Sequence, residues 1–360
     1  MNRRKILKFL TLLPFVSSCL WRGEKVKKVS NMIKSIQPIE LHWPTQEPFL
    51  FCAHHNDFYP VGNENFGLDQ KFFVGRNMGS DFVEKDGFRI YHGKEIPGFP
   101  VHPHRGFETI TIVRKGYADH ADSLGAAGRY GEGDVQWMTA GSGVQHSEMF
   151  PLLHQDKENT LELFQIWLNL PQKNKMVKPD FKMLWAEKIP KIKDGKAEVT
   201  LISGEYSDKK YFAAPENSWA SDASNQVNIL LVKLEAGGEF SYPGHSGTNR
   251  SLYFFDGAGA TLNGKEISSK NAVFVDASES LHVSSLGECE FLILEAKPIG
   301  EPVVQYGPFV MNTKEEIMQT MQDYQKTQFG GWSWNRSDMF HGAKIERFAK
   351  YPDGRIEKPV

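Results

Sequence analysis

The sequence predicts an all-β protein made of two β-barrel domains in tandem, with one helix near the C-terminus. Short runs of β-branched and aromatic residues recur along the chain, as in residues 109–113, and such residues favour strands. Glycines separate these runs, as between residues 125 and 133, which is typical of tight turns. A chain of 360 residues is long enough for about two domains.

The N-terminal residues 1–19 are interpreted as an export signal. Arg3, Arg4 and Lys5 precede an apolar run that ends in small residues before Cys19. The run is too short to span a membrane and has the pattern of a targeting segment. It resembles a twin-arginine signal followed by a lipoprotein cleavage site, with Cys19 as the lipid-anchored residue. We expect an envelope lipoprotein facing the periplasm, tethered by residues 20–43. The alternative is a short N-terminal helix packed on the protein.

The first domain is predicted over residues 44–175. Strands are expected at residues 49–53, 72–76, 88–91 and 161–170 and around residues 98–149. The polar residues 54–57, two of them histidines, have a loop-like context, and His54 and His55 lack the spacing expected of a second metal site. His120 and Asp122 are expected to have either a turn role or hydrogen bonds to metal ligands.

The second domain is predicted over residues 201–345, after a lysine- and proline-rich linker at 176–200. Strands are expected at residues 227–234, 252–255, 272–276 and 291–294, with a hairpin turn at Asn263-Gly264. Thr313 and Glu316 have the spacing of a capping box, so a helix is predicted from there to about Lys326. Residues 346–360 are expected to form a tail.

Composition excludes some classes of function. The formal net charge is −2, so no general field attracts nucleic acid. If Cys19 is acylated, only Cys52 and Cys289 remain, and free buried thiols are expected rather than a disulfide framework. The sequence has no C-x-x-C motif, so no thiolate metal site is expected.

Residues 98–149 contain the pattern of a metal site on strands. His102 and His104 are two residues apart, as are His146 and Glu148. On an extended chain both members of each pair point to one face, and two such pairs facing each other in a small barrel would surround one point. Nitrogen and oxygen ligands suit iron(II), manganese, zinc or copper, and open positions beside a histidine-rich set favour non-haem iron. For a single such pair, surface or hydrogen-bonded histidines would be the better interpretation.

Three motifs resemble the pirin family of the cupin superfamily: HPHRGFET, GDVQWMTAGSGVQHSEM and EPVVQYGPFVMNTKEEI. The resemblance covers roughly residues 44–360. It implies two cupin barrels, with His102, His104, His146 and Glu148 as metal ligands. Glu108, at the usual cupin carboxylate position, is then structural or a partner of a ligand. Only His245 occupies the corresponding place in the second domain, where no metal is expected.

The resemblance implies one iron(II) ion (Fe2+) per chain, with manganese, zinc, copper or nickel as alternatives. It implies a dioxygenase of the quercetin 2,3-dioxygenase type, taking O2 and a flavonol-like or enolic substrate. Glu148 would act as the catalytic base while it remains near the metal. One alternative is a non-catalytic iron-binding module that interacts with or regulates a partner. Another is a lipoprotein that binds a carbohydrate or flavonoid and holds an incidental metal.

Overall fold

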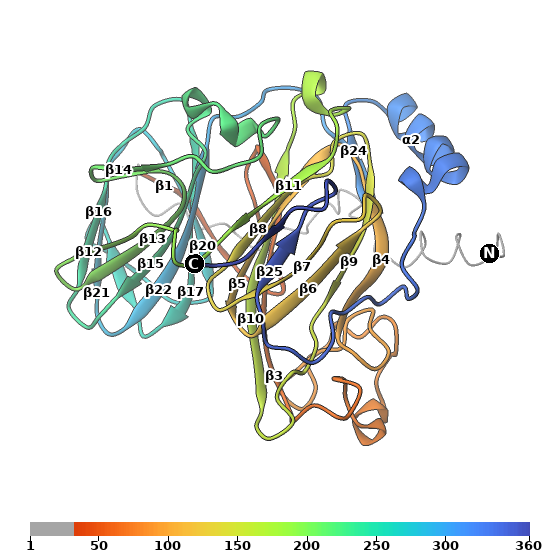
Figure 1. Ribbon diagram of the computed structural model, residues 1–360. Helices are drawn as coiled ribbons and strands as arrows, with labels where there is room; N and C mark the ends of the chain where they lie inside the picture. Colours follow the sequence, from red (N-terminus) through yellow and green to blue (C-terminus); the bar gives the residue numbers. More distant parts are fainter. Residues whose placement is uncertain (1–31) are drawn as a thin grey trace.

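The computed structural model describes residues 32–360. Two β-barrels lie side by side, and helix α2 lies at the far side of the first barrel (Figure 1). The expected export signal and the first part of the expected tether are outside the described residues. Within those residues, no helix has the length and apolar character needed to cross a membrane.

The first barrel consists of two antiparallel sheets, in the orders β11-β8-β5-β10-β3-β2 and β26-β25-β7-β6-β9-β4. Their bounds are β2 His42–Trp43, β3 Phe49–Tyr59, β4 Gly98–His104, β5 Phe107–Lys115, β6 Tyr117–Asp122, β7 Ala127–Gly131, β8 Val135–Thr139, β9 Val144–Met149, β10 Asn159–Asn169, β11 Asp180–Leu184, β25 Phe348–Lys350 and β26 Ile356–Glu357.

The second barrel repeats this plan with the sheets β1-β20-β17-β22-β15-β13-β12 and β16-β21-β18-β19, and β14 pairs with β13. Their bounds are β1 Ile33–Pro38, β12 Lys191–Asp194, β13 Ala197–Tyr206, β14 Lys209–Tyr211, β15 Asn228–Leu234, β16 Glu239–Tyr242, β17 Asn249–Gly257, β18 Ala260–Leu262, β19 Lys265–Ile267, β20 Asn271–Val275, β21 Leu281–Ser285 and β22 Cys289–Ala296. The predicted two-barrel, mainly β fold is confirmed.

The two barrels share one of the buried apolar clusters, and each barrel has a further cluster of its own. On β5, Ile110 and Ile112 alternate with Thr109 and Thr111, and successive side chains of a strand point to opposite faces. The isoleucines belong to a buried cluster that also contains residues of the second barrel, such as Tyr253. The threonines therefore point to the interior of the first barrel, where the candidate site lies.

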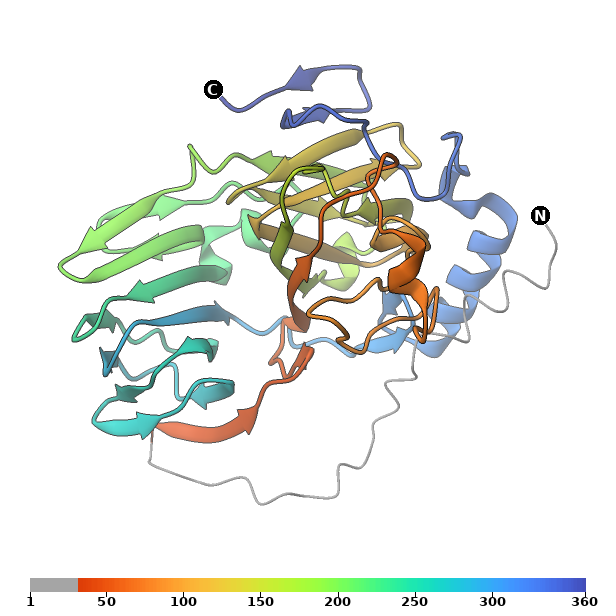
Figure 2. The ribbon, with the colours of Figure 1, turned by 90° about the horizontal axis from the view of Figure 1, so that it is seen from below.

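The C-terminal segment returns to the first barrel (Figures 1 and 2). It consists of β23 Val304–Tyr306, β24 Phe309–Met311 and α2 Lys314–Thr327, followed by β25 and β26. The predicted capping box is present, with Thr313 and Glu316 bonding reciprocally. Arg105 of the first barrel bonds Asp323 of α2 at 2.8 Å. The expected second domain and tail thus include elements that pack on the first barrel.

A close backbone approach makes this docking possible. Gly106 has φ +85, and a Cβ atom there would lie 2.0 Å from the carbonyl oxygen of Val310. Only glycine tolerates both the positive φ and the contact.

Several local expectations were wrong. Residues 33–38 and 42–43 of the expected tether form β1 and β2, because Ile33 and Trp43 are buried in the cores. The expected linker at 176–200 contains β11 and β12, which pair with β8 and β13. Residues 54–57 continue β3, since β10 pairs with them along its length.

The excursion between β3 and β4, residues 60–97, also differs from the prediction. Residues 72–76 and 88–91 contain no strand: their backbone forms a 3-10 turn, loops and isolated bridges, and aromatic side chains such as Phe88 and Tyr91 are buried in the core of the first barrel. The short 3-10 helices are η1 Gln70–Phe73, η2 Gln172–Asn174, η3 Trp219–Ser221, η4 Ala223–Asn225 and η5 Gln328–Gly330. Cys52 and Cys289 are free and buried, as expected.

Candidate metal centre

Three histidines lie together on β4 and β9. His102 is directly opposite His146, and His104 lies two residues further along β4. Their ligand atoms all lie within 4.8 Å of one another, close to the roughly 3–4 Å that separates two donors of one ion. The structure thus brings together the three histidines that the sequence pattern singled out.

Burial makes all three histidines weak bases. It lowers the pKa of His102 to about 4, and it lowers the pKa of His104 and His146 well below their ordinary value. Nδ1 of His102 bonds the carbonyl oxygen of Pro100 at 2.9 Å, so Nε2 carries the free lone pair. A neutral imidazole is the form that binds a metal ion.

The surroundings of His146 indicate whether a metal ion fits this cluster. Its side chain is fully buried, and neither ring nitrogen has a hydrogen-bond partner within the described residues. Buried polar atoms are rarely left in that state, because losing water without a replacement bond costs about 1–3 kcal/mol. Nε2 lies 3.9 Å from Oε2 of Glu148, too far for a hydrogen bond. An ion between these atoms would bind the lone pair of Nε2, so the donor set fits a metal.

The carboxylate of Glu148 borders the cluster and is held by three donors. Thr111 Oγ1 donates to Oε1 at 3.0 Å, Tyr130 OH to Oε1 at 3.3 Å, and Gln165 Nε2 to Oε2 at 2.7 Å. Sequence reasoning missed these three residues. Thr111 shares its strand face with Thr109, a signal in the alternation of residues 109–113, whereas Tyr130 and Gln165 come close only through the sheet pairing.

Glu108 lies on the other face of β5, away from the histidines. It is fully buried and accepts hydrogen bonds from Thr139 Oγ1 at 2.6 Å and from Ser218 Oγ at 2.7 Å. Burial raises its pKa to about 7. Because Ser218 lies between β14 and β15 of the second barrel, Glu108 connects the two barrels, which is the structural one of the two roles considered for it.

His54 and His55 do not join the cluster. Nε2 of His54 lies 3.2 Å from Oε1 of Glu162, and the ring of His55 packs edge-on against Tyr91. His120 is fully buried, its Nε2 lies 3.3 Å from Oδ2 of Asp122, and its ring centroid is 5.5 Å from that of His146.

The second barrel has a different set of residues at the corresponding places. β21 takes the position of β9 in the sheet order, and it carries the buried apolar residues Leu281 and Val283. Nδ1 of His245 bonds Oε1 of Glu295 at 2.5 Å, and Arg250 also bonds that carboxylate. His245 is thus held by a hydrogen bond with a glutamate.

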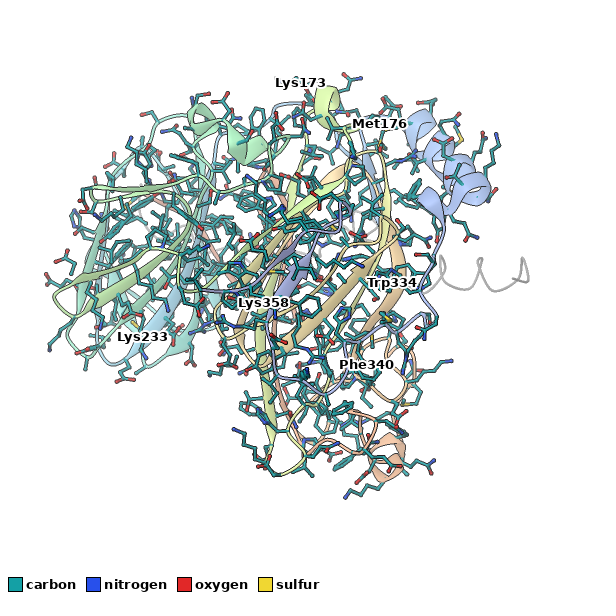
Figure 3. The ribbon with its side chains drawn as sticks, in the orientation of Figure 1. Lys173, Met176, Lys233, Trp334, Phe340 and Lys358 are labelled. Atoms are coloured by element: carbon teal, nitrogen blue, oxygen red, sulfur yellow. The ribbon has the colours of Figure 1, made fainter. Side chains whose placement is uncertain are left out.

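The C-terminal segment closes over the first barrel beside the site. Indole Nε1 of Trp334 donates to the carbonyl oxygen of Asp122 at 2.7 Å, and Val101 N donates to the carbonyl oxygen of Ser337 at 2.7 Å. Figure 3 shows Trp334 on the β4 side of the first barrel and Phe340 nearer the excursion between β3 and β4. The ring of Phe340 lies against Phe66 of that excursion.

Known proteins resemble this chain in both barrels. Residues 45–168 match the family model described as Pirin, and residues 229–330 match the Pirin C-terminal cupin domain. A pirin-like protein of Solanum lycopersicum is 38% identical over 273 residues, covering 73% of this chain and 87% of the relative. Pirin of Homo sapiens is 34% identical over 252 residues, covering 68% and 81%.

A solved structure supports the same assignment. Quercetin 2,3-dioxygenase from Acinetobacter baumannii superposes with a TM-score of 0.64 and 29% identity, covering 79% of this chain and 87% of that one. The matches to both cupin domains, the identities with the relatives and the arrangement of the strands all indicate the same family. The chain belongs to the pirin family.

Proposed function

We propose that this protein is a metal-dependent dioxygenase of the quercetin 2,3-dioxygenase type, acting with O2 on flavonol-like or enolic substrates. The observation that carries the proposal is a cluster of three neutral histidines, of which His104 and His146 are buried and His102 is partly buried, beside a carboxylate held by three donors. The likeness to a protein named quercetin 2,3-dioxygenase supports the substrate class.

The ion proposed for this site is iron(II), held by His102, His104, His146 and Glu148. Nitrogen and oxygen donors without thiolate are compatible with it, and four protein ligands leave positions for other molecules. When bound, such an ion supplies Lewis acidity and one-electron redox chemistry. Manganese, zinc, copper and nickel fit the same donor types.

Glu148 is proposed to take the proton of the enolic hydroxyl. Gln165 and Thr111 hold the carboxylate in one orientation beside the histidines, and a base must be within hydrogen-bond reach of its proton. The ionised substrate is then more electron-rich toward O2. In the reaction on a flavonol, both atoms of O2 enter the products and one ring carbon leaves as carbon monoxide.

The test is carbon monoxide release from quercetin in air by the full chain reconstituted with iron(II). His104→Ala is expected to lose bound iron and carbon monoxide release together. His282→Ala is a matched control, because His282 lies exposed on the second barrel, and it is expected to retain both.

Two results would contradict the proposal. Full iron content in His104→Ala would refute the ligand assignment. Iron-loaded protein that releases no carbon monoxide and consumes no O2 with quercetin or simpler enols would favour a non-catalytic iron-binding module instead.

We also propose that the chain is exported and anchored to a membrane through a lipid on Cys19. Only the sequence of residues 1–19 supports this, through its basic start, apolar run and small residues before the cysteine. Cys19→Ser is expected to move the protein from the membrane fraction to the soluble fraction. Mass spectrometry that finds an unmodified, uncleaved N-terminus in the native protein would refute the anchor.

A further inference from the structure

Within residues 32–360, two buried imidazole nitrogens beside the proposed metal centre lack a hydrogen-bond partner. Nδ1 of His146 and Nδ1 of His120 are both buried, and neither has a hydrogen-bond partner among the described residues. The strands β6 and β9 pair with His120 opposite Glu148 and Asp122 opposite His146. All four side chains therefore share one face of the sheet, and His120 is the diagonal neighbour of His146.

Asp122 sets the tautomer of His120. Its Oδ1 accepts hydrogen bonds from the backbone N–H groups of Leu124 and Ala126, both at 2.9 Å. Its Oδ2 lies 3.3 Å from Nε2 of His120. A carboxylate only accepts hydrogen bonds, so Nε2 of His120 carries the proton. In the neutral ring, Nδ1 of His120 is then an acceptor.

His146 needs an acceptor at its own Nδ1. Nε2 is the nitrogen that faces Glu148, so metal binding through Nε2 leaves the proton on Nδ1. Histidines that bind metal almost always donate this second N–H to a carboxylate, carbonyl or water, which fixes the ring and strengthens the ligand. The ring centroids of His120 and His146 are 5.5 Å apart and the rings are tilted by 54°, a separation compatible with an N–H···N bond after a small ring rotation.

We infer that His120 and Asp122 are positioning residues of the metal centre: Asp122 holds His120 as an acceptor, and His120 accepts the Nδ1–H of His146 in the metal-bound protein. The inference rests on the metal site alone. It holds whether or not the protein turns over a flavonol, because the bond concerns the ligand and not the substrate.

The chemistry of the pair predicts what each substitution does. His120→Phe keeps a planar ring against Phe181, which His120 contacts, but removes the acceptor. Asp122→Asn retains an oxygen for the backbone N–H groups of Leu124 and Ala126 and turns an amide N–H toward His120. Nε2 of His120 then becomes the acceptor and its Nδ1 carries the proton, so two N–H groups face each other.

The experiment measures the affinity of the full chain for zinc(II), by competition with a coloured chelator. Both His120→Phe and Asp122→Asn are expected to weaken binding about 10- to 100-fold, and His120→Gln, which keeps an acceptor, is expected to recover part of the loss. His341→Gln is the matched control, because within the part of the chain that the structure describes Nε2 of His341 bonds only the backbone carbonyl oxygen of His120, at 2.7 Å. It is expected to bind zinc(II) like the wild type.

Two further measurements separate positioning from folding. Thermal unfolding of the metal-free variants measures what each substitution costs the fold, because the hydrogen bond between His120 and Asp122 is present without metal, and zinc affinity is then compared at a temperature at which every variant is folded. Nitrogen-15 NMR of the zinc-loaded wild type is expected to show His120 protonated at Nε2 and His146 at Nδ1. Unchanged zinc affinity in both His120→Phe and Asp122→Asn would overturn the inference, as would a His120 ring protonated at Nδ1 in the zinc-loaded wild type.

Discussion

Gln165 shows how one polar side chain in an apolar strand serves the site. It lies on β10 between the buried residues Phe164 and Ile166, which belong to the core between the barrels. Strand alternation turns Gln165 to the opposite face, where Nε2 donates to Oε2 of Glu148 at 2.7 Å and also reaches Thr111 Oγ1 at 3.3 Å. Of the three hydrogen bonds that hold the carboxylate of Glu148, the proposed base, the bond from Gln165 is the shortest.

Removal of this donor should affect the site more than the fold. Gln165→Leu is expected to lower kcat/KM for the reconstituted enzyme by about 10- to 100-fold, the usual effect of losing such a partner. Gln155→Leu is the control, because Gln155 is exposed and, among residues 32–360, its side chain bonds only the carbonyl oxygen of Asn63. A Gln165→Leu enzyme with wild-type kinetics would show that Thr111 and Tyr130 suffice to hold Glu148.

Glu162 makes the stability of the first barrel depend on pH. Burial alone would raise its pKa, but the hydrogen bonds to His54 and Lys115 and the charge of Arg114 overcome this and lower the pKa to about 2. The ordinary value is 4.5, so the ionised form is favoured in the folded state. Its contribution is complete above about pH 4.5 and is lost as pH falls toward 2.

We expect wild-type unfolding free energy, measured with urea at several pH values, to fall more steeply below about pH 5 than that of Glu162→Gln. The difference should be on the order of 3 kcal/mol, since the pKa falls from 4.5 to about 2 and each pKa unit corresponds to about 1.4 kcal/mol. Equal slopes in the two proteins would mean that the carboxylate is not stabilised by its cationic partners.

Helix α2 shows how local chemistry and long-range docking combine. Oγ1 of Thr313 accepts the N–H of Glu316 at 3.1 Å, and Oε2 of Glu316 accepts the N–H of Thr313 at 2.9 Å. The helix then docks through Asp323, which pairs with Arg105, while the guanidinium of Arg105 lies 4.4 Å from the ring centroid of Phe329. The cap starts the helix, and the ion pair positions it.

Loss of the cap should cost stability without affecting the site. Thr313→Ala is expected to lower the unfolding free energy by about 1 kcal/mol, the typical value of such a cap, with metal content unchanged. Thr313→Ser keeps the hydroxyl and is expected to retain most of that stability. Chemical denaturation of both variants makes the comparison, and equal losses would show that the methyl group of Thr313 matters instead of its oxygen.

At the scale of the whole molecule, the two barrels are joined by buried apolar and polar contacts. Ile110, Ile112 and Trp137 of the first barrel share a core cluster with Tyr253 and Leu292 of the second. Arg114 also bonds both Glu162 and Glu290, one on each barrel. Barrels that bury a common core lose that burial if either one unfolds alone.

The metal-free chain is therefore expected to unfold in a single calorimetric transition, with equal calorimetric and van't Hoff enthalpies. Differential scanning calorimetry of the full chain makes the test. Two resolved transitions would show that the shared core is too weak to couple the barrels.

Local patterns in the sequence were sufficient for much of this protein. The i, i+2 spacing of His102 with His104 predicted side chains on one face, because a strand repeats every two residues. The cap of α2 depends on residues three apart, Thr313 and Glu316, and it too was predicted. Four strands of the second barrel, β15, β17, β20 and β22, were found in the same way, from runs of apolar and β-branched residues.

Tertiary structure decided what depends on contacts distant in the chain. The strand at residues 54–57 exists because β10 pairs with it, and β1 exists because β20 does, although neither segment has a strong strand pattern of its own. The face of Glu108 and the three donors to Glu148 follow from which strands become neighbours. A sequence pattern with a period of two residues determines which side chains share a face, but the partner of that face is selected by the burial of apolar surface over the whole molecule.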